Sequence, residues 1–472
     1  MRTRPLAVAA AAAVLLSVVT GCGGDTSDDD GADAEETTSA GSDLEPSDVA
    51  TATDTVGAAD VEIDGDATAE VNQLAVAAIT DLQSYWTDEF PALYGADYQE
   101  VAGGLYALTP DSEAGPECAD SYSNVQGNAF YCKLDDSVAW DAAELLPDLQ
   151  EKYGDFVIPI VLAHEWGHAM QQRSGFFDQN ELTVSSELQA DCFAGGWAAH
   201  AIDAGVFDVS SGDLDTALAG ILDLRDTPGT NSMDASAHGS GFDRVSAFQD
   251  GFDGGAEACA GFEDGTPVVL ELPFSTEEDA AAGGNAPYES IINGVPFDLE
   301  DYWSQLYPEL TDGEEWTPLS GFEPFDPASP PACGDVDTST YSLFYCVPDD
   351  YVGFDNVGEM PRIYEQGGDY AVATLLATQW GLAALARAQV DVSEQESTRI
   401  TDCFAGGYTA SVILHNRAET SSFSISPGDL DEGIKALLVF RGDGDADRQG
   451  AGYDRVKAFR QGVIRGAESC VE

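Results

Sequence analysis

A five-residue segment, His164-Glu165-Trp166-Gly167-His168, carries two imidazoles and a carboxylate. The surrounding residues 156–173 are predicted to form a helix, and side chains four residues apart lie on one face of a helix. His164 and His168 can therefore direct their rings at one metal ion, while Glu165 projects beside it toward water. The chain has only five histidines, so the match is specific. It predicts a zinc site in which Glu165 is the general base.

A catalytic zinc site of this type needs a third protein ligand and one open position. Glu187 follows on a second predicted helix, and Asp191 lies one turn later on the same face. This spacing favours Glu187 as the third zinc ligand and Asp191 as the carboxylate that orients a ligand imidazole. The alternative is that both are solvated helix charges. For Asp191 a structural role has added support, because Asp402 occupies the same place in the second half.

The helices that must position these residues belong to a sequence that repeats itself. Four segments of the first half return in the second at offsets of 211 to 217 residues: 81–86 as 298–303, 130–132 as 344–346, 191–196 as 402–407, and 243–245 as 454–456. We interpret the repeats as a tandem duplication of one domain. The predicted parts are a signal peptide (1–21), an acidic disordered tether (22–66), an active domain (67–262), a linker (263–282) and a degenerate copy (283–472).

The second copy lacks the proposed chemistry. The proposed catalytic residues are replaced while Trp380-Gly381, Asp402 and Asp454-Arg455 are kept, and we interpret residues lost together as serving one reaction. We therefore expect no catalytic zinc in this copy. We expect it to pack against the first copy, with a substrate groove or a partner site as alternative roles, and we expect Asp243 and Arg244 to form a structural ion pair. The replacements are Thr378 for His164, Gln379 for Glu165, Leu382 for His168, Thr398 for Glu187 and Gln449 for His238.

Over most of residues 80–260 the chain resembles the neutral zinc metallopeptidases, a bacterial family with an HExGH helix and an ELQADCxAG segment, here 164–168 and 187–195. The aromatic-Tyr-Cys at 130–132 before a short strand, and His238-Gly239-Ser240 with Arg244, match as well. The resemblance implies one zinc ion and peptide hydrolysis, but no particular substrate. Ala169 departs from the family, where another His often follows the second ligand.

Each copy is expected to be α+β and mostly helical, with a zincin-like fold and a small sheet at the edge of the cleft. His238 is an additional candidate in the active copy. Its preferred role is to donate a hydrogen bond to the developing oxyanion, with a structural role and a ligand role as alternatives.

Nine cysteines divide into Cys22 and four in each copy. Disulfides suit an oxidising compartment, and a thiolate zinc site is disfavoured because no CxxC spacing occurs. Four cysteines allow three connectivities in each copy. The preferred pairs are Cys118 with Cys132, Cys192 with Cys259, Cys333 with Cys346, and Cys403 with Cys470.

The first residues of the chain predict that the protein is exported from the cytoplasm. Arg2 and Arg4 precede an apolar run, 6–19, that fits a secretory signal, and Val19-Thr20-Gly21-Cys22 resembles the bacterial lipobox. We expect a lipoprotein anchored to the cell membrane through Cys22. The net charge of −68 predicts no nucleic-acid partner, because phosphates would be repelled. The expected partner is a peptide or protein substrate, and the alternative function is a non-catalytic surface binding or scaffold lipoprotein.

Overall fold

The computed structural model describes residues 61–471, except 120, 180–182, 232–236, 265–268, 271, 418–422 and 441–447. The predicted signal peptide, Cys22 and most of the predicted tether lie outside the described residues. Residues 61–66 depart from the prediction of a solvated tether, because Asp64 bridges to Tyr106 and exchanges backbone hydrogen bonds with Leu105 and Ala107. The packed chain therefore begins before residue 67. No helix in the described part is long and apolar enough to cross a membrane.

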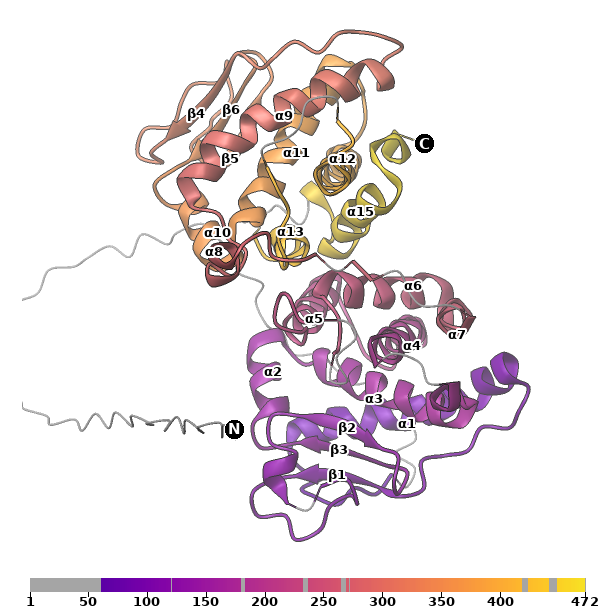
Figure 1. The fold of residues 1–472 in the computed structure, drawn as a ribbon. Helices are drawn as coiled ribbons and strands as arrows, with labels where there is room; N and C mark the ends of the chain where they lie inside the picture. The colour runs from indigo at the N-terminus through magenta and orange to yellow at the C-terminus, as the bar shows by residue number, and fades with distance from the viewer. Residues whose placement is uncertain are drawn as a thin grey trace, which may run out of the picture. The chain divides into compact units, whose positions relative to one another are not determined.

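The first half combines helices with one three-stranded sheet (Figure 1). The central strand β3 is parallel to β1 and antiparallel to β2, so β2 is an edge strand. The elements are α1 (Glu70–Tyr94), β1 (Gly104–Leu108), η1 (Tyr122–Asn124), β2 (Ala129–Cys132), β3 (Ser137–Asp141), α2 (Leu145–Tyr153), α3 (Val157–Ser174), η2 (Phe176–Gln179), α4 (Thr183–Asp203), α5 (Ser211–Asp223), α6 (Gly241–Cys259) and α7 (Gly261–Asp264).

The second half has a similar order of elements and a sheet of the same topology. Strand β6 is parallel to β4 and antiparallel to β5. The short helix α8 falls within the predicted linker, which is therefore partly helical. Its elements are α8 (Glu277–Ala281), α9 (Tyr288–Leu310), β4 (Gly321–Phe325), β5 (Leu343–Cys346), β6 (Tyr351–Asp355), α10 (Glu359–Gly367), α11 (Asp369–Arg387), α12 (Glu394–Leu414), α13 (Asp429–Leu438), α15 (Gly452–Arg465) and η3 (Ala467–Val471). The mostly helical α+β composition agrees with the prediction.

Helix α3 is buried on nearly every side. A helix that is apolar all round belongs in the interior of a domain, where neighbouring elements cover each face. Pro159 is tolerated because it lies in the first turn, whose N–H groups have no partner within the helix. The polar residues His164 and Glu165 are therefore carried into the core, against β2 and α4.

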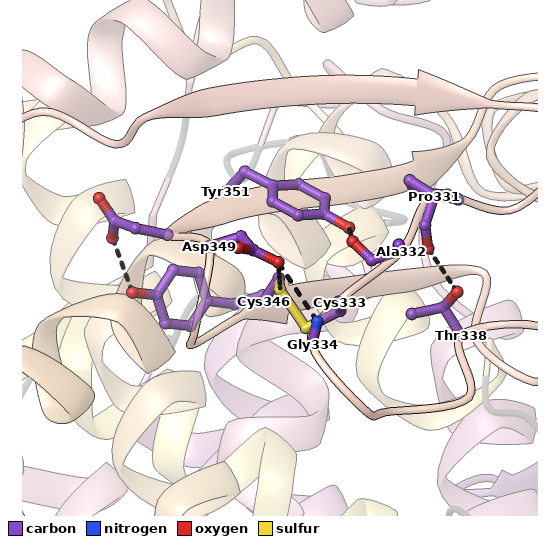
Figure 2. The surroundings of a disulfide bond; sticks show 10 residues. Pro331, Ala332, Cys333, Gly334, Thr338, Cys346, Asp349 and Tyr351 are labelled. Atoms are coloured by element: carbon purple, nitrogen blue, oxygen red, sulfur yellow. Dashed lines mark hydrogen bonds between the residues drawn. A yellow bond between two sulfur atoms is a disulfide. The ribbon is translucent and has the colours of Figure 1, made fainter.

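Four disulfides join the cysteines in the expected pairs. Two of them tie the closely packed helix pairs α4 with α6 and α12 with η3, and two lie at the ends of β2 and β5. Figure 2 shows the last of these, where the Thr338 and Tyr351 hydroxyls donate to the backbone carbonyls of Pro331 and Ala332. The bonds are Cys118–Cys132, Cys192–Cys259, Cys333–Cys346 and Cys403–Cys470.

Reciprocal hydrogen bonds connect residues of the two halves. Asp215 of α5 accepts from the backbone N–H groups of Gly452 and Tyr453, at 2.6 and 2.7 Å. Asp431 of α13 accepts from the N–H of Phe242 at 2.7 Å. The three donors belong to the first turns of α15 and α6, whose N–H groups lack partners within their helices. Each half therefore supplies a carboxylate that accepts hydrogen bonds from backbone N–H groups at the start of a helix in the other half.

Candidate metal centre

A close crossing of α3 and α4 brings the predicted ligands together. A Cβ atom added to Gly167 would lie 2.8 Å from the Cα of Ala190, so any larger residue would force the two helices apart. The glycine between the two histidines therefore has a packing role. It allows Glu187, one turn before Ala190, to face His164 and His168.

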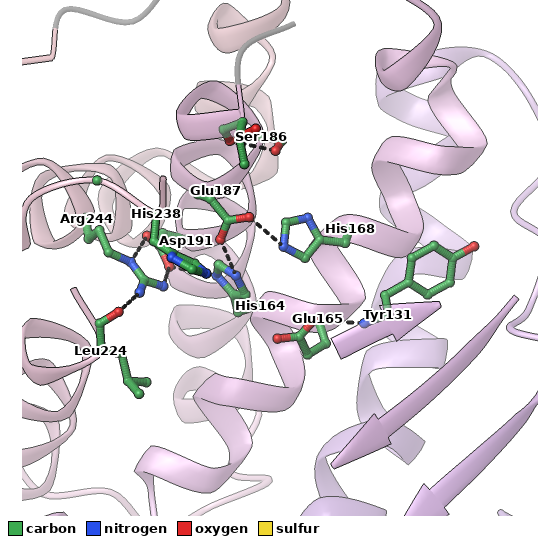
Figure 3. Close-up of polar contacts among 12 residues, drawn as sticks. Tyr131, His164, Glu165, His168, Ser186, Glu187, Asp191, Leu224, His238 and Arg244 are labelled. Carbon is green, nitrogen blue, oxygen red and sulfur yellow. Dashed lines mark hydrogen bonds and ion pairs between the residues drawn. The ribbon is translucent and has the colours of Figure 1, made fainter. Parts of the chain in front are cut away.

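The three predicted ligands converge on one point (Figure 3). The Nε2 atom of His164 lies 3.2 Å from Glu187 Oε2, and the Nε2 atom of His168 lies 3.5 Å from Glu187 Oε1. One donor atom from each of the three residues lies within 4.8 Å of the other two. Two imidazole nitrogens and a carboxylate oxygen form a donor set suited to zinc, with a position left for water or substrate.

The other nitrogen of each imidazole has a hydrogen-bond partner. His164 Nδ1 lies 2.7 Å from Asp191 Oδ1, and His168 Nδ1 lies 2.9 Å from Gln171 Oε1. The Gln171 amide also donates to the backbone carbonyl of Ser186 at 2.6 Å, so its oxygen faces the imidazole. Both rings can therefore carry the proton on Nδ1 and present the Nε2 lone pair to a metal. Sequence reasoning missed Gln171, although it lies one turn beyond His168.

Arg244 pairs with Asp191 and not with Asp243, which corrects the sequence prediction. Its Nε and Nη2 atoms each lie 2.8 Å from an Asp191 oxygen, and both side chains are buried. Asp243 instead accepts a hydrogen bond from the hydroxyl of Ser240, the residue that caps the start of α6. Asp191 therefore links Arg244 to the His164 imidazole.

Charge interactions dominate the ionisation of the cluster. Burial lowers the pKa of His164, but the carboxylates of Asp191 and Glu187 outweigh it and raise the pKa to about 10. Burial raises the pKa of Glu187, but the neighbouring His168 and His164 hold it well below its usual value. Because a metal binds the neutral imidazole, metal binding competes with protonation and releases a proton.

Glu165 lies beside the cluster without being one of its three donors. It is buried, and its Oε2 atom accepts a hydrogen bond from the backbone N–H of Tyr131 in β2 at 3.0 Å. Burial raises the pKa of its carboxyl group, and the nearby Glu187 adds to the effect. A carboxylate with a raised pKa is a more effective proton acceptor near neutral pH. The contact with Tyr131 connects residues 34 positions apart, and no local pattern indicated it.

The cluster and Glu165 line one pocket of about 620 Å³. Its volume is typical of small-molecule or substrate sites, which combine apolar walls with a few converging polar groups. His238 also lines it, with 53% of its side chain exposed, and its Nδ1 lies 3.2 Å from Asp226 Oδ1. His238 lies outside the three-donor cluster. The apolar side of the wall includes Phe130, Leu145, Val157, Ile160, Val161, Phe176 and Phe177.

The second half contains a similar buried ion pair but not the three predicted zinc ligands. Arg455 binds Asp402 at 2.8 and 2.9 Å, the counterpart of the pair of Arg244 with Asp191. Gln449, which replaces His238, accepts a hydrogen bond from Arg455 at 2.9 Å. Among the described residues, no group of potential metal donors includes a residue at the positions that match His164, His168 and Glu187.

This difference provides an internal control for the role of Asp191. Asp191→Asn is expected to weaken zinc binding by about 10–100-fold, because the amide holds the His164 imidazole less strongly than the carboxylate does. Asp402→Asn makes the same change in the corresponding buried pair with Arg455 and should leave zinc affinity unchanged. Competition with a chromophoric chelator measures both. Equal zinc affinity in the Asp191→Asn variant and the wild type would contradict an orienting role.

The predicted zinc ligands lie in a part of the chain that matches the sequence model of a known family. The sequence model of the family described as "Putative neutral zinc metallopeptidase" matches residues 31–262. That range contains the three donors, Glu165, His238 and Arg244. No solved structure matches the chain.

Relatives with similar sequences are themselves uncharacterized. Protein YpfJ of Escherichia coli (strain K12) is 34% identical over 151 residues, which cover 27% of this chain and 52% of that protein. Protein Rv2575 of Mycobacterium tuberculosis (strain ATCC 25618 / H37Rv) is 29% identical over 168 residues, which cover 30% of this chain and 57% of that protein. The chain thus spans little more than half the length of either relative.

Proposed function

We propose that this protein is an extracytoplasmic zinc-dependent peptidase that hydrolyses peptide bonds with Glu165 as the general base. The observation that carries the proposal is the convergence of His164, His168 and Glu187 beside Glu165 in one pocket. The family match over residues 31–262 supports it.

The donor set fits zinc, and His164, His168 and Glu187 would hold it. A bound zinc ion supplies Lewis acidity, which lowers the pKa of water and polarises a carbonyl group. Glu165 then accepts the proton of the attacking water and delivers it to the leaving amine. The N–H of Tyr131 holds one oxygen of Glu165, so the carboxylate keeps a defined orientation during both transfers.

The pocket supports an extended peptide as the substrate. Residues of the edge strand β2, including Phe130 and Tyr131, line the pocket. An edge strand can pair with an added peptide through backbone hydrogen bonds, here through groups other than the N–H of Tyr131, which donates to Glu165. The apolar wall suits an apolar substrate side chain. His238 lies on the same pocket and is assigned the hydrogen bond to the oxyanion.

We further propose that residues 283–472 are a degenerate copy of 67–262 and hold no catalytic zinc. The matching sheet topology, the disulfides with equal spacing and the pair of Asp402 with Arg455 support a common origin. The second copy would act as a packing partner of the first, in keeping with the reciprocal contacts of Asp215 and Asp431.

The location is proposed from the start of the chain. The basic residues, the apolar run and Val19–Cys22 support export and anchoring through a lipid on Cys22. The four disulfides support an oxidising compartment.

The test is zinc content and proteolysis in the same preparations. Wild type is expected to carry one zinc per chain and to degrade an unfolded protein in a chelator-sensitive manner. His164→Ala should lose both the zinc and the activity, because it removes a ligand. Gln379→Ala, at the corresponding segment of the second half, is the control and should retain both. Zinc without cleavage of any unfolded protein would favour a binding or scaffold protein, and absence of zinc would overturn the proposal.

A further inference from the structure

A second group of carboxylates lies in the other half of the chain, where the proposed peptidase chemistry has no use for it. Asp369 and Asp429 are the first residues of α11 and α13, and Glu432 lies one turn into α13. Donor atoms of all three lie within 4.8 Å of one another. Asp369 and Asp429 are only 3% and 2% exposed. Three adjacent carboxylates, two of them buried, need a compensating positive charge or proton.

Backbone groups hold one oxygen of each carboxylate. The N–H of Ala286 donates to Asp369 Oδ2 at 2.8 Å, and the N–H of Ser426 donates to Asp429 Oδ2 at 2.7 Å. The N–H of Tyr370 donates to an oxygen of Glu432 at 2.8 Å. The three side chains are therefore held in fixed orientations.

The other oxygen of each aspartate has no hydrogen-bond partner among the described residues. Asp369 Oδ1 and Asp429 Oδ1 are both fully buried. An unpaired buried carboxylate oxygen is costly, so natural structures almost always satisfy it. One oxygen from each of the three carboxylates lies within 4.8 Å of the other two, so a cation held among them could satisfy both aspartates.

The backbone at Gly368 makes room for Glu432. Gly368 has φ +94°, and a Cβ atom there would lie 2.1 Å from Glu432 Oε1. Any other residue would be strained and would also collide with the carboxyl group. The Glu432 side chain is therefore seated directly against the start of α11, beside Asp369.

The three carboxylates have a further acidic neighbour, Asp279, and a weakly acting basic one, Arg225. Asp279 of α8 raises the pKa of Asp369 and Asp429, although burial is the larger cause for both. Burial and the neighbouring Asp369 raise the pKa of Glu432 to about 9, while Arg225 opposes the shift weakly. The cluster thus favours uptake of a proton or of a metal cation.

The first half differs at one of the three positions. Asp155 and Asp213 correspond to Asp369 and Asp429, but Thr216 corresponds to Glu432. The Thr216 hydroxyl donates to the backbone carbonyl of Asp213 at 2.9 Å, an ordinary contact within a helix. The third carboxylate is therefore a feature of the half that lacks the zinc donors.

We propose that Asp369, Asp429 and Glu432 bind one calcium ion, which joins the starts of α11 and α13. Within the part of the chain that the structure describes, the site offers carboxylate oxygens, which hard cations prefer, and no nitrogen or sulfur donor that would favour zinc. Calcium accepts irregular coordination and would complete its shell with water. Magnesium requires nearly octahedral geometry and gives up its water reluctantly, so it fits three crowded carboxylates less well.

The test uses the full chain, freed of divalent ions with EDTA and then returned to buffer with 150 mM KCl, which screens weak binding to the acidic surface. Titration calorimetry with CaCl2 is expected to show one saturable site in the wild type, and calcium should raise the melting temperature. Glu432→Gln, which keeps the shape but removes the charge, and Glu432→Thr, which introduces the first-half residue, should each weaken calcium binding at least tenfold. Glu278→Gln on the exposed face of α8 is the charge-matched control and should bind as the wild type does.

The same titration identifies the alternatives. His164→Ala should retain calcium binding, which separates this site from the zinc cluster and makes the result independent of peptidase activity. No saturable calcium site in the wild type, or equal binding by Glu432→Gln, would overturn the proposal. A melting temperature that calcium leaves unchanged but Glu432→Gln raises would identify a pair of carboxyl groups sharing a proton. Tighter binding of MgCl2 than of CaCl2 would overturn the assignment to calcium.

Discussion

Glu165→Gln is expected to lower the rate of peptide hydrolysis by about 10²–10⁴-fold while zinc remains bound, the range that general base catalysis contributes. The amide has nearly the shape of the carboxylate and can still accept the hydrogen bond from Tyr131, so the fold of the pocket should be unchanged. It cannot accept a proton from water at any working pH. The loss should appear in kcat more than in KM, because the proton moves in the transition state.

The measurement combines zinc content with the rate of cleavage of an unfolded protein. Glu151→Gln, an exposed residue of α2, makes the same chemical change away from the pocket and should leave the rate unchanged. A Glu165→Gln variant that keeps its zinc and cleaves as fast as the wild type would show that another group accepts the proton.

Removal of the buried arginines is expected to have the largest effect on stability. Arg244→Met removes the guanidinium that pairs with the buried Asp191, and breaking such a pair costs about 3–5 kcal/mol. Arg455→Met does the same to Asp402 in the second half. The burial of the two pairs is closely matched, since both arginines are 6% exposed and their partners are 3% and 0% exposed. Both variants should therefore melt at lower temperature by a similar amount.

Zinc affinity distinguishes the two variants. Without Arg244, Asp191 is free to move away from the His164 imidazole, so Arg244→Met should bind zinc more weakly than the wild type. Arg455→Met should not change zinc affinity, because Thr378 occupies the position that corresponds to His164. Calorimetric melting and chelator competition on both variants give the comparison. Equal losses of zinc affinity in the two variants would show that general destabilisation, and not the bridge through Asp191, controls the metal.

Local spacing carried much of the information about the site. His164, Glu165 and His168 follow one another at helical intervals, and Glu187 and Asp191 do the same, so the sequence alone predicts which side chains share a face. The repeated cysteine intervals likewise led to the pairs that the structure contains. These features depend on residues close together in the chain, or on a pattern that occurs twice.

Contacts between distant segments required the tertiary structure. The sequence suggested a pair between neighbours Asp243 and Arg244, whereas the arginine reaches Asp191, 53 residues away, because α6 packs along α4. The hydrogen bond from Tyr131 to Glu165 likewise forms only because β2 packs against α3.

The meeting of Asp369 with Glu432 had no sequence signal at all. Sequence determined the chemical groups of this protein and the helix faces that carry them. Only the packing of helices and strands decided which groups meet, because the burial of apolar faces, and not the polar residues themselves, sets the distance and angle at which two elements come together.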